Sequence, residues 1–172
     1  LTRLVLVLCV LGIAGALAFG NLRRLLETAG VGTDGVGLVA VFIPGADYRQ
    51  HINPPWLEAF PNESDRPARK TNHVNLPDGV YVQLQATAVA GARRQTAGVP
   101  GLSHRDPLPM GSRGGDLFFT SVMTPPHPRD GQNVAGARPQ IARCFENLSL
   151  LMQQAGGSLD DVVHLWVFMS DF

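Results

Sequence analysis

Apolar residues recur with the period of an α-helix in two stretches of the chain. Across residues 141–155 they stand three or four positions apart, on one helical face: Ile141, Cys144, Phe145, Leu148, Leu151, Met152 and Ala155. A shorter stripe comprises Phe19, Leu22, Leu25, Leu26 and Ala29. Gly30 and Gly156 follow the two stripes, and glycine readily adopts the left-handed conformation that ends a helix. The pattern therefore predicts two amphipathic helices with glycine stops.

Segments typical of strands follow both predicted helices. Residues 35–43 and 161–169 are rich in Val, Leu and Phe, as buried central strands are. A further helix is expected from residue 46, with an interruption at the proline pair 54–55. Residues 70–76 and 80–90 predict a hairpin through the turn Pro77-Asp78-Gly79, and residues 117–123 predict another strand. This order predicts an α+β fold in which one sheet carries two helices on one face.

The two helix–strand units are copies of one sequence. Residues 19–42 align without a gap with residues 145–168, and ten of the 24 aligned positions are identical. Unrelated segments of ordinary composition would share about one or two. The offset of 126 residues (145 − 19) is the size of a small domain and too long for a solenoid repeat. The chain therefore holds parts of two copies of one domain.

This repeat sets the expected domain organisation. Residues 19–92 are predicted to be the C-terminal portion of a first copy, and residues 113–172 the N-terminal portion of a second. Residues 93–112 lie in a stretch rich in Gly, Pro, Arg and Ser and are predicted to be a linker. We expect a fragmentary or cut sequence rather than a deliberately permuted single domain.

The first 18 residues form a separate segment. Residues 4–19 are almost entirely apolar, a run of 16 residues between Arg3 and Arg23, whereas a transmembrane helix needs about 20. The run fits the apolar region of a signal peptide, with Ala16-Leu17-Ala18 as a cleavage site. A second interpretation, sequence unrelated to the ancestral domain, remains open. A secreted or membrane-attached product is an alternative only if the segment is a real leader.

Charge and composition narrow the classes of partner and cofactor. The formal net charge is zero, with no basic run, which argues against a nucleic-acid partner. Two cysteines, Cys9 and Cys144, indicate neither a zinc site nor a disulfide framework. The five histidines lack the spacing of metal ligands, so no metal site is predicted.

Candidate chemistry lies in Arg66-Pro67-Ala68-Arg69, directly before a predicted strand. A guanidinium held there by proline-restricted backbone could grip a carboxylate through two parallel hydrogen bonds. The competing interpretation is an ordinary solvated surface arginine.

The order of several motifs resembles the Rid family of reactive-intermediate imine/enamine deaminases. These motifs are INPPWLEAFP, RPAR, LPDG and VQLQATAVA in the first copy, and GGDLFFTS followed by a Pro/Gly-rich loop and helix in the second. The resemblance covers about residues 19–90 and 113–172. It implies a chorismate-mutase-like α+β fold, a cytoplasmic location, and a homo-oligomer (trimer or pseudo-trimer) with ligand sites between subunits.

Site residues follow from the same resemblance. The hallmark arginine of the family falls on Arg69, which would bind a substrate carboxylate, and a family asparagine falls on Asn53. A hydroxyl-bearing stretch that lines the ligand falls on Thr120 and Ser121. The family's acidic residue, which would orient or activate water, falls on Gln83, with Gln85 the less favoured match.

Two departures from the family pattern bear on activity. Glutamine at position 83 can orient water but cannot take its proton. Val122 stands where glycine is usual, which weakens the expected backbone contact with a ligand. The implied reaction is the hydrolysis of small 2-imino or enamine acids to 2-oxo acids and ammonia, without metal or organic cofactor. The alternatives are a non-catalytic module that binds small carboxylates or other partners, and a truncated fragment without independent function.

Overall fold

The computed structural model describes residues 2–169 of the chain, with side chains from residue 14 onward. Its helices are α1 (Thr2–Thr28), α2 (Asn53–Ala59) and α3 (Ala137–Gln154), and single 3-10 turns occupy Thr33–Gly35, Ala46–His51, Glu63–Asp65 and Leu159–Asp161. The strands are β1 (Val36–Ile43), β2 (Ala68–His73), β3 (Gln83–Ala88), β4 (Gln95–Ala97), β5 (Gly111–Gly114) and β6 (Leu117–Thr120). The predicted α+β fold class is confirmed by these helices and strands.

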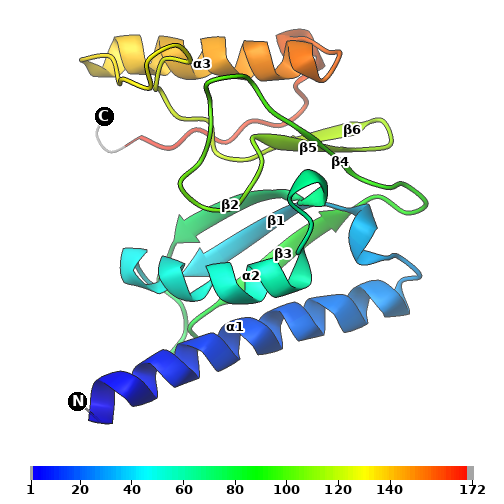
Figure 1. Cartoon of the computed structure of the whole chain (residues 1–172), viewed down its shortest axis with the longest axis vertical. Helices are drawn as coiled ribbons and strands as arrows, with labels where there is room; N and C mark the ends of the chain where they lie inside the picture. Colours follow the sequence, from blue (N-terminus) through cyan, green and yellow to red (C-terminus); the bar gives the residue numbers. More distant parts are fainter. Residues whose placement is uncertain (1, 170–172) are drawn as a thin grey trace.

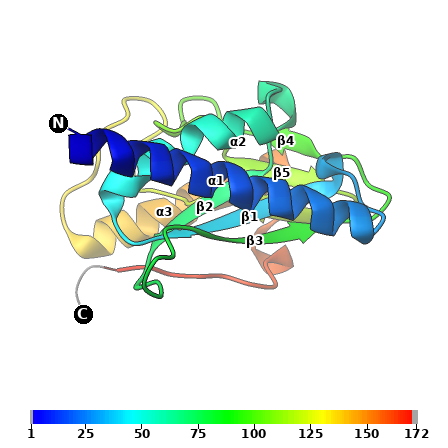
Figure 2. The same cartoon turned by 90° about the horizontal axis from the view of Figure 1, so that it is seen from below.

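The strands form two small sheets instead of the single sheet that was expected. One sheet has the order β2-β1-β3 and the other the order β4-β5-β6. Helices α1 and α2 lie together on one side of the first sheet, as the pattern predicted, while α3 lies at the opposite end of the molecule beyond the second sheet (Figure 1). Seen from below, α1 and α2 lie over the first sheet and run in roughly the same direction as its strands (Figure 2).

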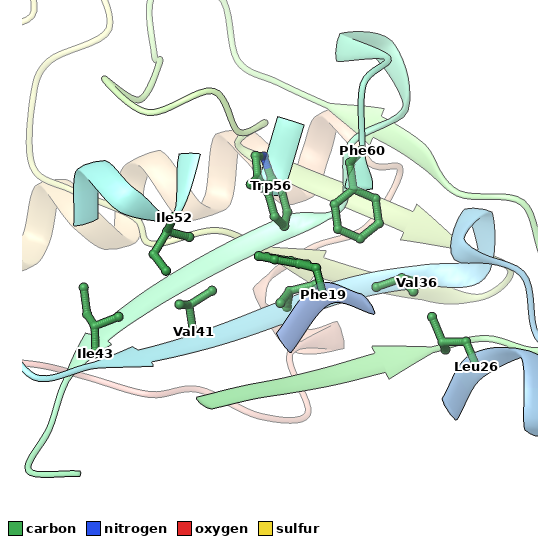
Figure 3. Close-up of a cluster of buried hydrophobic side chains, with 9 residues drawn as sticks. Phe19, Leu26, Val36, Val41, Ile43, Ile52, Trp56 and Phe60 are labelled. Atoms are coloured by element: carbon green, nitrogen blue, oxygen red, sulfur yellow. The ribbon is translucent and has the colours of Figure 1, made fainter. Parts of the chain in front are cut away.

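The main core lies between the first sheet and the two helices that pack against it, α1 and α2. Phe19 of α1 packs edge-on against Trp56 of α2 and against Phe60, the residue that follows α2, with ring centroids 6.1 Å and 6.3 Å apart. Alternate side chains of β1, including Val39 and Val41, complete this core from the sheet (Figure 3). Burying several large apolar side chains at one place contributes about 1.5–3 kcal/mol for each. The faces of β1 and β2 that point toward α2 are therefore fixed by packing.

The predicted hairpin between residues 70–76 and 80–90 is wrong in its pairing. The Pro77-Asp78-Gly79 turn does form, since the Val80 N–H donates to the Pro77 carbonyl oxygen at 3.0 Å. The two strands, however, flank β1 on opposite sides: β2 runs parallel to β1 and β3 runs antiparallel. The apolar strand β1 gains two hydrogen-bonded neighbours by this arrangement, so it occupies the buried centre that its composition favours.

The predicted strand over residues 161–169 is also absent. After the 3-10 turn Leu159–Asp161 the described chain runs on without strand pairing, and most of its side chains are exposed. Its copy in the first repeat, β1, lies between two partner strands. A strand needs a neighbour for its backbone hydrogen bonds, and none of the described residues supplies one here.

Residues 93–112, predicted as a linker, are packed into the protein. They contain β4 and the start of β5, which pair with each other. Arg94 is buried and donates to the carbonyl oxygens of Thr33, Val36 and Asp65. The apolar segment of residues 2–18 is helical and continuous with the first predicted helix, because α1 runs from Thr2 to Thr28. No helix among the described residues combines the length and apolar character needed to cross a bilayer.

Candidate anion site around Arg69

Arg69 lies in β2 with its side chain directed toward α2. It pairs with Val39 of β1, a residue whose side chain is in the main core, and only 1% of Arg69 is exposed. Its guanidinium carbon lies 4.9 Å from the centre of the Trp56 ring. The competing interpretation, a solvated surface arginine, does not fit a side chain that is stacked on a buried aromatic ring.

Two polar side chains meet the Nη2 atom of Arg69. Nη2 donates to Asn53 Oδ1 at 2.9 Å and forms an ion pair with Asp106 Oδ2 at 3.1 Å. Asn53 Nδ2 in turn donates to the other oxygen of Asp106 at 3.1 Å. Arg49 reaches the same carboxylate, with its Nη1 3.3 Å from Oδ2. Arg69, Asn53, Asp106 and Arg49 are hereafter called the Arg69 cluster.

The rest of the Arg69 guanidinium has no partner among the described residues. Its Nε and Nη1 atoms are buried without a hydrogen bond. A guanidinium offers five N–H donors, and leaving buried donors unpaired costs free energy. The arrangement therefore favours binding of an additional acceptor oxygen at this position.

Burial controls the ionisation of the site. Desolvation lowers the pKa of Arg69 to about 10, against the opposing effect of Asp106, so the side chain is still a cation near neutral pH. His104 lies close enough to feel the charges of Asp106, Arg69 and Arg49, and its Nε2 is buried without a partner. Desolvation lowers the pKa of His104 more than the Asp106 carboxylate raises it. The imidazole is consequently neutral at pH 7.

Ser121 acts on the backbone of Arg69. Its buried Oγ accepts from the Arg69 N–H at 3.0 Å and donates to the Pro109 carbonyl oxygen at 2.7 Å. With both functions used inside the protein, the hydroxyl positions β2. Thr120 ends β6 and is half-buried, and Val122 just beyond it is exposed.

Gln83 and Gln85 lie on the other face of the first sheet. In β3 their side chains are exposed, while Leu84 and Ala86 between and beyond them pack on the main core. Gln85 pairs with Ala40, which is the partner of Lys70 and not of Arg69. Within one chain, the structure thus brings together Arg69, Asn53 and Ser121 and leaves Gln83 apart from them.

Sequence reasoning missed Asp106 and His104 as members of this site. Both belong to the predicted linker, where the sequence His104-Arg105-Asp106-Pro107 gives no periodic pattern. The available signal was the concentration of three ionisable residues inside a loop otherwise rich in Gly, Pro and Leu. In the described part of the chain, no three His, Cys, Asp or Glu residues gather in a way that would hold a metal ion.

A hollow of about 320 Å³ lies elsewhere, beside the C-terminal end of α1. It is lined by Arg23, Leu26, Glu27, Val31, Gly32, Thr33 and Ala59. It contains none of the residues that the sequence placed in the site.

The structure is that of an α+β protein with a buried arginine on an edge strand, stacked against a tryptophan of a helix. A relative of known family shares part of this sequence: the RutC family protein of Pyrococcus abyssi is 34% identical over 58 residues, 33% of this chain and 46% of that protein. The chain is therefore similar, over less than half of the relative's length, to a protein of the RutC family. No family model matches it.

Solved structures resemble the chain over a similar extent. A proposed endoribonuclease from Thermotoga maritima is 36% identical, with a TM-score of 0.37 over 40% of this chain and 54% of that one. A proposed L-PSP endoribonuclease from Entamoeba histolytica is 28% identical, with a TM-score of 0.40 over 43% and 58%. A YjgF family member from Neisseria meningitidis is 20% identical, with a TM-score of 0.38 over 42% and 60%. The chain spans about half the length of the relatives it matches.

Proposed function

We propose that the Arg69 cluster binds the carboxylate of a small 2-imino or enamine acid and that the protein hydrolyses this compound to a 2-oxo acid and ammonia. The observation that carries the proposal is the guanidinium of Arg69, desolvated over Trp56, already facing one carboxylate and retaining two unpaired donors. Charge-assisted pairing in a dry site is about twice as strong as a neutral hydrogen bond.

The reaction needs positioning more than it needs a strong base. Water adds to the imine carbon, the proton passes to nitrogen, and collapse of the carbinolamine breaks the C–N bond and releases ammonia. Arg69 holds the acid end, Asn53 fixes the orientation of the guanidinium, and Ser121 holds the backbone of Arg69. Holding a reactant in one geometry lowers the barrier by removing orientational freedom.

Gln83 has no step in this proposal for a single chain, because its side chain lies on the face opposite Arg69. Thr120, at the end of β6, is proposed only to line the approach. A homo-oligomer, trimer or pseudo-trimer, remains a prediction from the family resemblance.

A second candidate function is a non-catalytic module that binds small carboxylates. It is favoured by one specific observation: no carboxylate besides Asp106, itself paired with two arginines, approaches Arg69 among the described residues. Such a module would share the anchor and lack the hydrolysis.

The deciding experiment measures 2-oxo acid release from an imino acid formed in place by an amino-acid oxidase. We expect the unmodified protein to accelerate hydrolysis. Arg69→Ala should lose at least about 100-fold in kcat/KM, since the substitution removes both the positive charge and the pair of parallel N–H donors that binds a carboxylate. Arg69→Lys keeps the charge without the fork, and should lose about tenfold or more.

The matched control is Arg105→Ala, which removes an exposed arginine next to Asp106 and should keep the full rate. Circular dichroism and thermal unfolding establish that each variant is folded. Full activity in folded Arg69→Ala would refute the proposed anchor. Carboxylate binding that depends on Arg69, without any acceleration of hydrolysis, would establish the second candidate.

A further inference from the structure

The segment that supplies Asp106 is a long loop fastened over the site. Residues 98–110 join β4 to β5 without secondary structure. Val99 and Met110 bury their side chains near the two ends of this loop. In its middle, Trp56 Nε1 donates to the Pro107 carbonyl oxygen at 2.9 Å. Loops of this length in compact domains are often functional, and this one holds Asp106 against Arg69.

The contact atom on Arg69 decides what else can bind. A carboxylate that grips a guanidinium with both oxygens uses Nη2 together with either Nε or Nη1, because these are the two forks that the planar group presents. In this protein Nη2 is the atom that Asn53 and Asp106 occupy. Nε and Nη1 are free, but each lacks its fork partner.

We propose that Asp106 is a built-in competitor that takes the carboxylate position on Arg69, so that a small monocarboxylic acid binds fully only when Asp106 is displaced. This inference rests on the proposed function, in which Arg69 is a carboxylate anchor. It adds a residue of the predicted linker that regulates an anchor in the first copy.

The geometry makes Asp106 displaceable. Only one Asp106 oxygen, Oδ2, contacts Arg69, at the single nitrogen Nη2. A ligand carboxylate that binds the guanidinium with both oxygens gains a second, parallel hydrogen bond. The Asp106 side chain is 16% exposed, so its carboxylate is in contact with solvent. Arg49, whose side chain is 46% exposed, is 3.3 Å from the same oxygen and can retain Asp106 after it leaves Arg69.

The charge of the cluster indicates the class of ligand. Two arginines share one aspartate, Asn53 is neutral, and the neighbouring His104 has a pKa lowered by burial. The cluster therefore carries one uncompensated positive charge, which a single carboxylate neutralises. A dicarboxylate would bring one buried negative charge too many.

The test measures binding of 2-oxobutanoate, a stable monocarboxylate, by isothermal titration calorimetry on the full chain. We expect weak binding to the unmodified protein and binding at least about tenfold tighter to Asp106→Ala and Asp106→Asn, because the competing carboxylate is gone. Asp106→Asn keeps the size and shape of the side chain. Arg105→Ala, beside it, should bind as the unmodified protein does.

Loss of the buried counter-charge will destabilise Asp106→Ala, so a second readout accompanies the titration. Adding 2-oxobutanoate should raise the Tm of both Asp106 variants by more than that of the unmodified protein, as ligands of the folded state do. The double variant Asp106→Asn/Arg69→Ala should neither bind nor show the shift.

The outcomes separate the two claims. Equal or weaker binding by the folded Asp106→Asn variant, with binding still lost in Arg69→Ala, overturns the competitor and leaves the anchor in place. Absence of binding in every variant overturns the anchor and the competitor together. Tighter binding that survives Arg69→Ala places the ligand elsewhere and also overturns the inference.

Discussion

A buried arginine is costly unless its surroundings replace water, and Arg69 shows how this chain does so. Trp56 covers one face of the guanidinium, and Asn53 and Asp106 meet one of its nitrogens. Two of its three nitrogens, Nε and Nη1, remain without a hydrogen-bond partner. The desolvation cost of an ion in a protein interior is several kcal/mol, so an arginine that is only partly satisfied is better suited to a ligand site than to a purely structural role.

His104 provides a prediction about pH at the same site. Its pKa is lowered in the folded protein, first by burial, while an unfolded histidine titrates near 6.5. Below that value the unfolded chain takes up a proton that the folded chain resists. His104 therefore costs stability that grows as the pH falls through about 6.5. His104→Gln should flatten this acid loss in denaturant unfolding measured between pH 5 and pH 8.

The same histidine reports on Asp106. Because the carboxylate raises the His104 pKa against burial, Asp106→Asn should lower that pKa further in an NMR titration, with the His104→Gln spectrum assigning the signal. A rise of the His104 pKa, or no change in it, would mean that the His104 and Asp106 side chains are not neighbours in solution.

A site residue could be predicted from the sequence when it lay within a recognisable motif. Arg69 and Asn53 stand inside motifs whose order resembles a known family, and the structure brings these two side chains together. Asp106 is 37 positions beyond Arg69 (106 − 69) in a segment without periodicity, so its approach depends on the tertiary path of a loop. Gln83 was chosen by alignment to a motif, and strand alternation sends its side chain away from Arg69.

At the scale of elements, two serine side chains satisfy backbone groups of β2 that strand pairing leaves open. Ser112 Oγ accepts from the Ala68 N–H at 3.2 Å and donates to the Gly37 carbonyl oxygen, while Ser121 does the same for Arg69 and Pro109. Ser112 of β5 and Ser121, directly after β6, thus satisfy backbone groups of the first sheet. An open sheet edge would otherwise leave these groups unpaired or available to other chains.

Ser121→Ala should reveal the strength of these hydrogen bonds. It leaves the buried Arg69 N–H and the Pro109 carbonyl oxygen without their partner, which should lower the free energy of unfolding by about 1–3 kcal/mol. Ser103→Ala removes an exposed hydroxyl from the nearby loop and should change it by less than about 0.5 kcal/mol. Urea unfolding of both variants measures the difference. Equal, small effects would show that the edge is solvated in solution.

Helices and strands could be predicted where the pattern of their own side chains was enough to specify them. The helices near residues 19–29 and 141–155 and the strand β1 follow from periodicity and composition. The pairing of β2 and β3 did not follow, because a turn signal fixes the bend of the chain without fixing which strand lies beside which. Strands β4 and β5 were missed because β4 has only 3 residues and β5 has 4 with glycine at both ends, so neither carries a clear pattern.

For the whole molecule, the repeat in sequence does not produce a repeat in packing. Leu25 of α1 is 69% exposed, while its copy, Leu151 of α3, is fully buried. Phe19 and Phe145 show the reverse relationship. The two helices therefore bury different faces, because α1 packs with α2 on the first sheet and α3 lies at the other end of the molecule (Figure 1).

The exposed segment after α3 predicts self-association. Trp166 and Phe168 are half-exposed or more, and Val163 is 96% exposed. A contiguous apolar segment without a paired strand is a site for contact between chains. Light scattering on size-exclusion fractions should show an apparent mass that rises with protein concentration. Trp166→Ser/Phe168→Ser should reduce this rise, whereas Leu117→Ser, an exposed apolar residue of β6, should not. A single mass at all concentrations would contradict the prediction.

The position of Arg94 has a consequence for how this gene can be altered. The residue stands at the start of the stretch between the two copies, yet its guanidinium is anchored on carbonyl oxygens from three separate places in the first copy. An insertion just before Arg94 would displace its guanidinium from the interior. A cut there would leave the carbonyl oxygens of Thr33, Val36 and Asp65 without this hydrogen-bond donor. The junction between the copies is thus a poor point for splicing, tagging or swapping, although the amino-acid composition suggests the opposite.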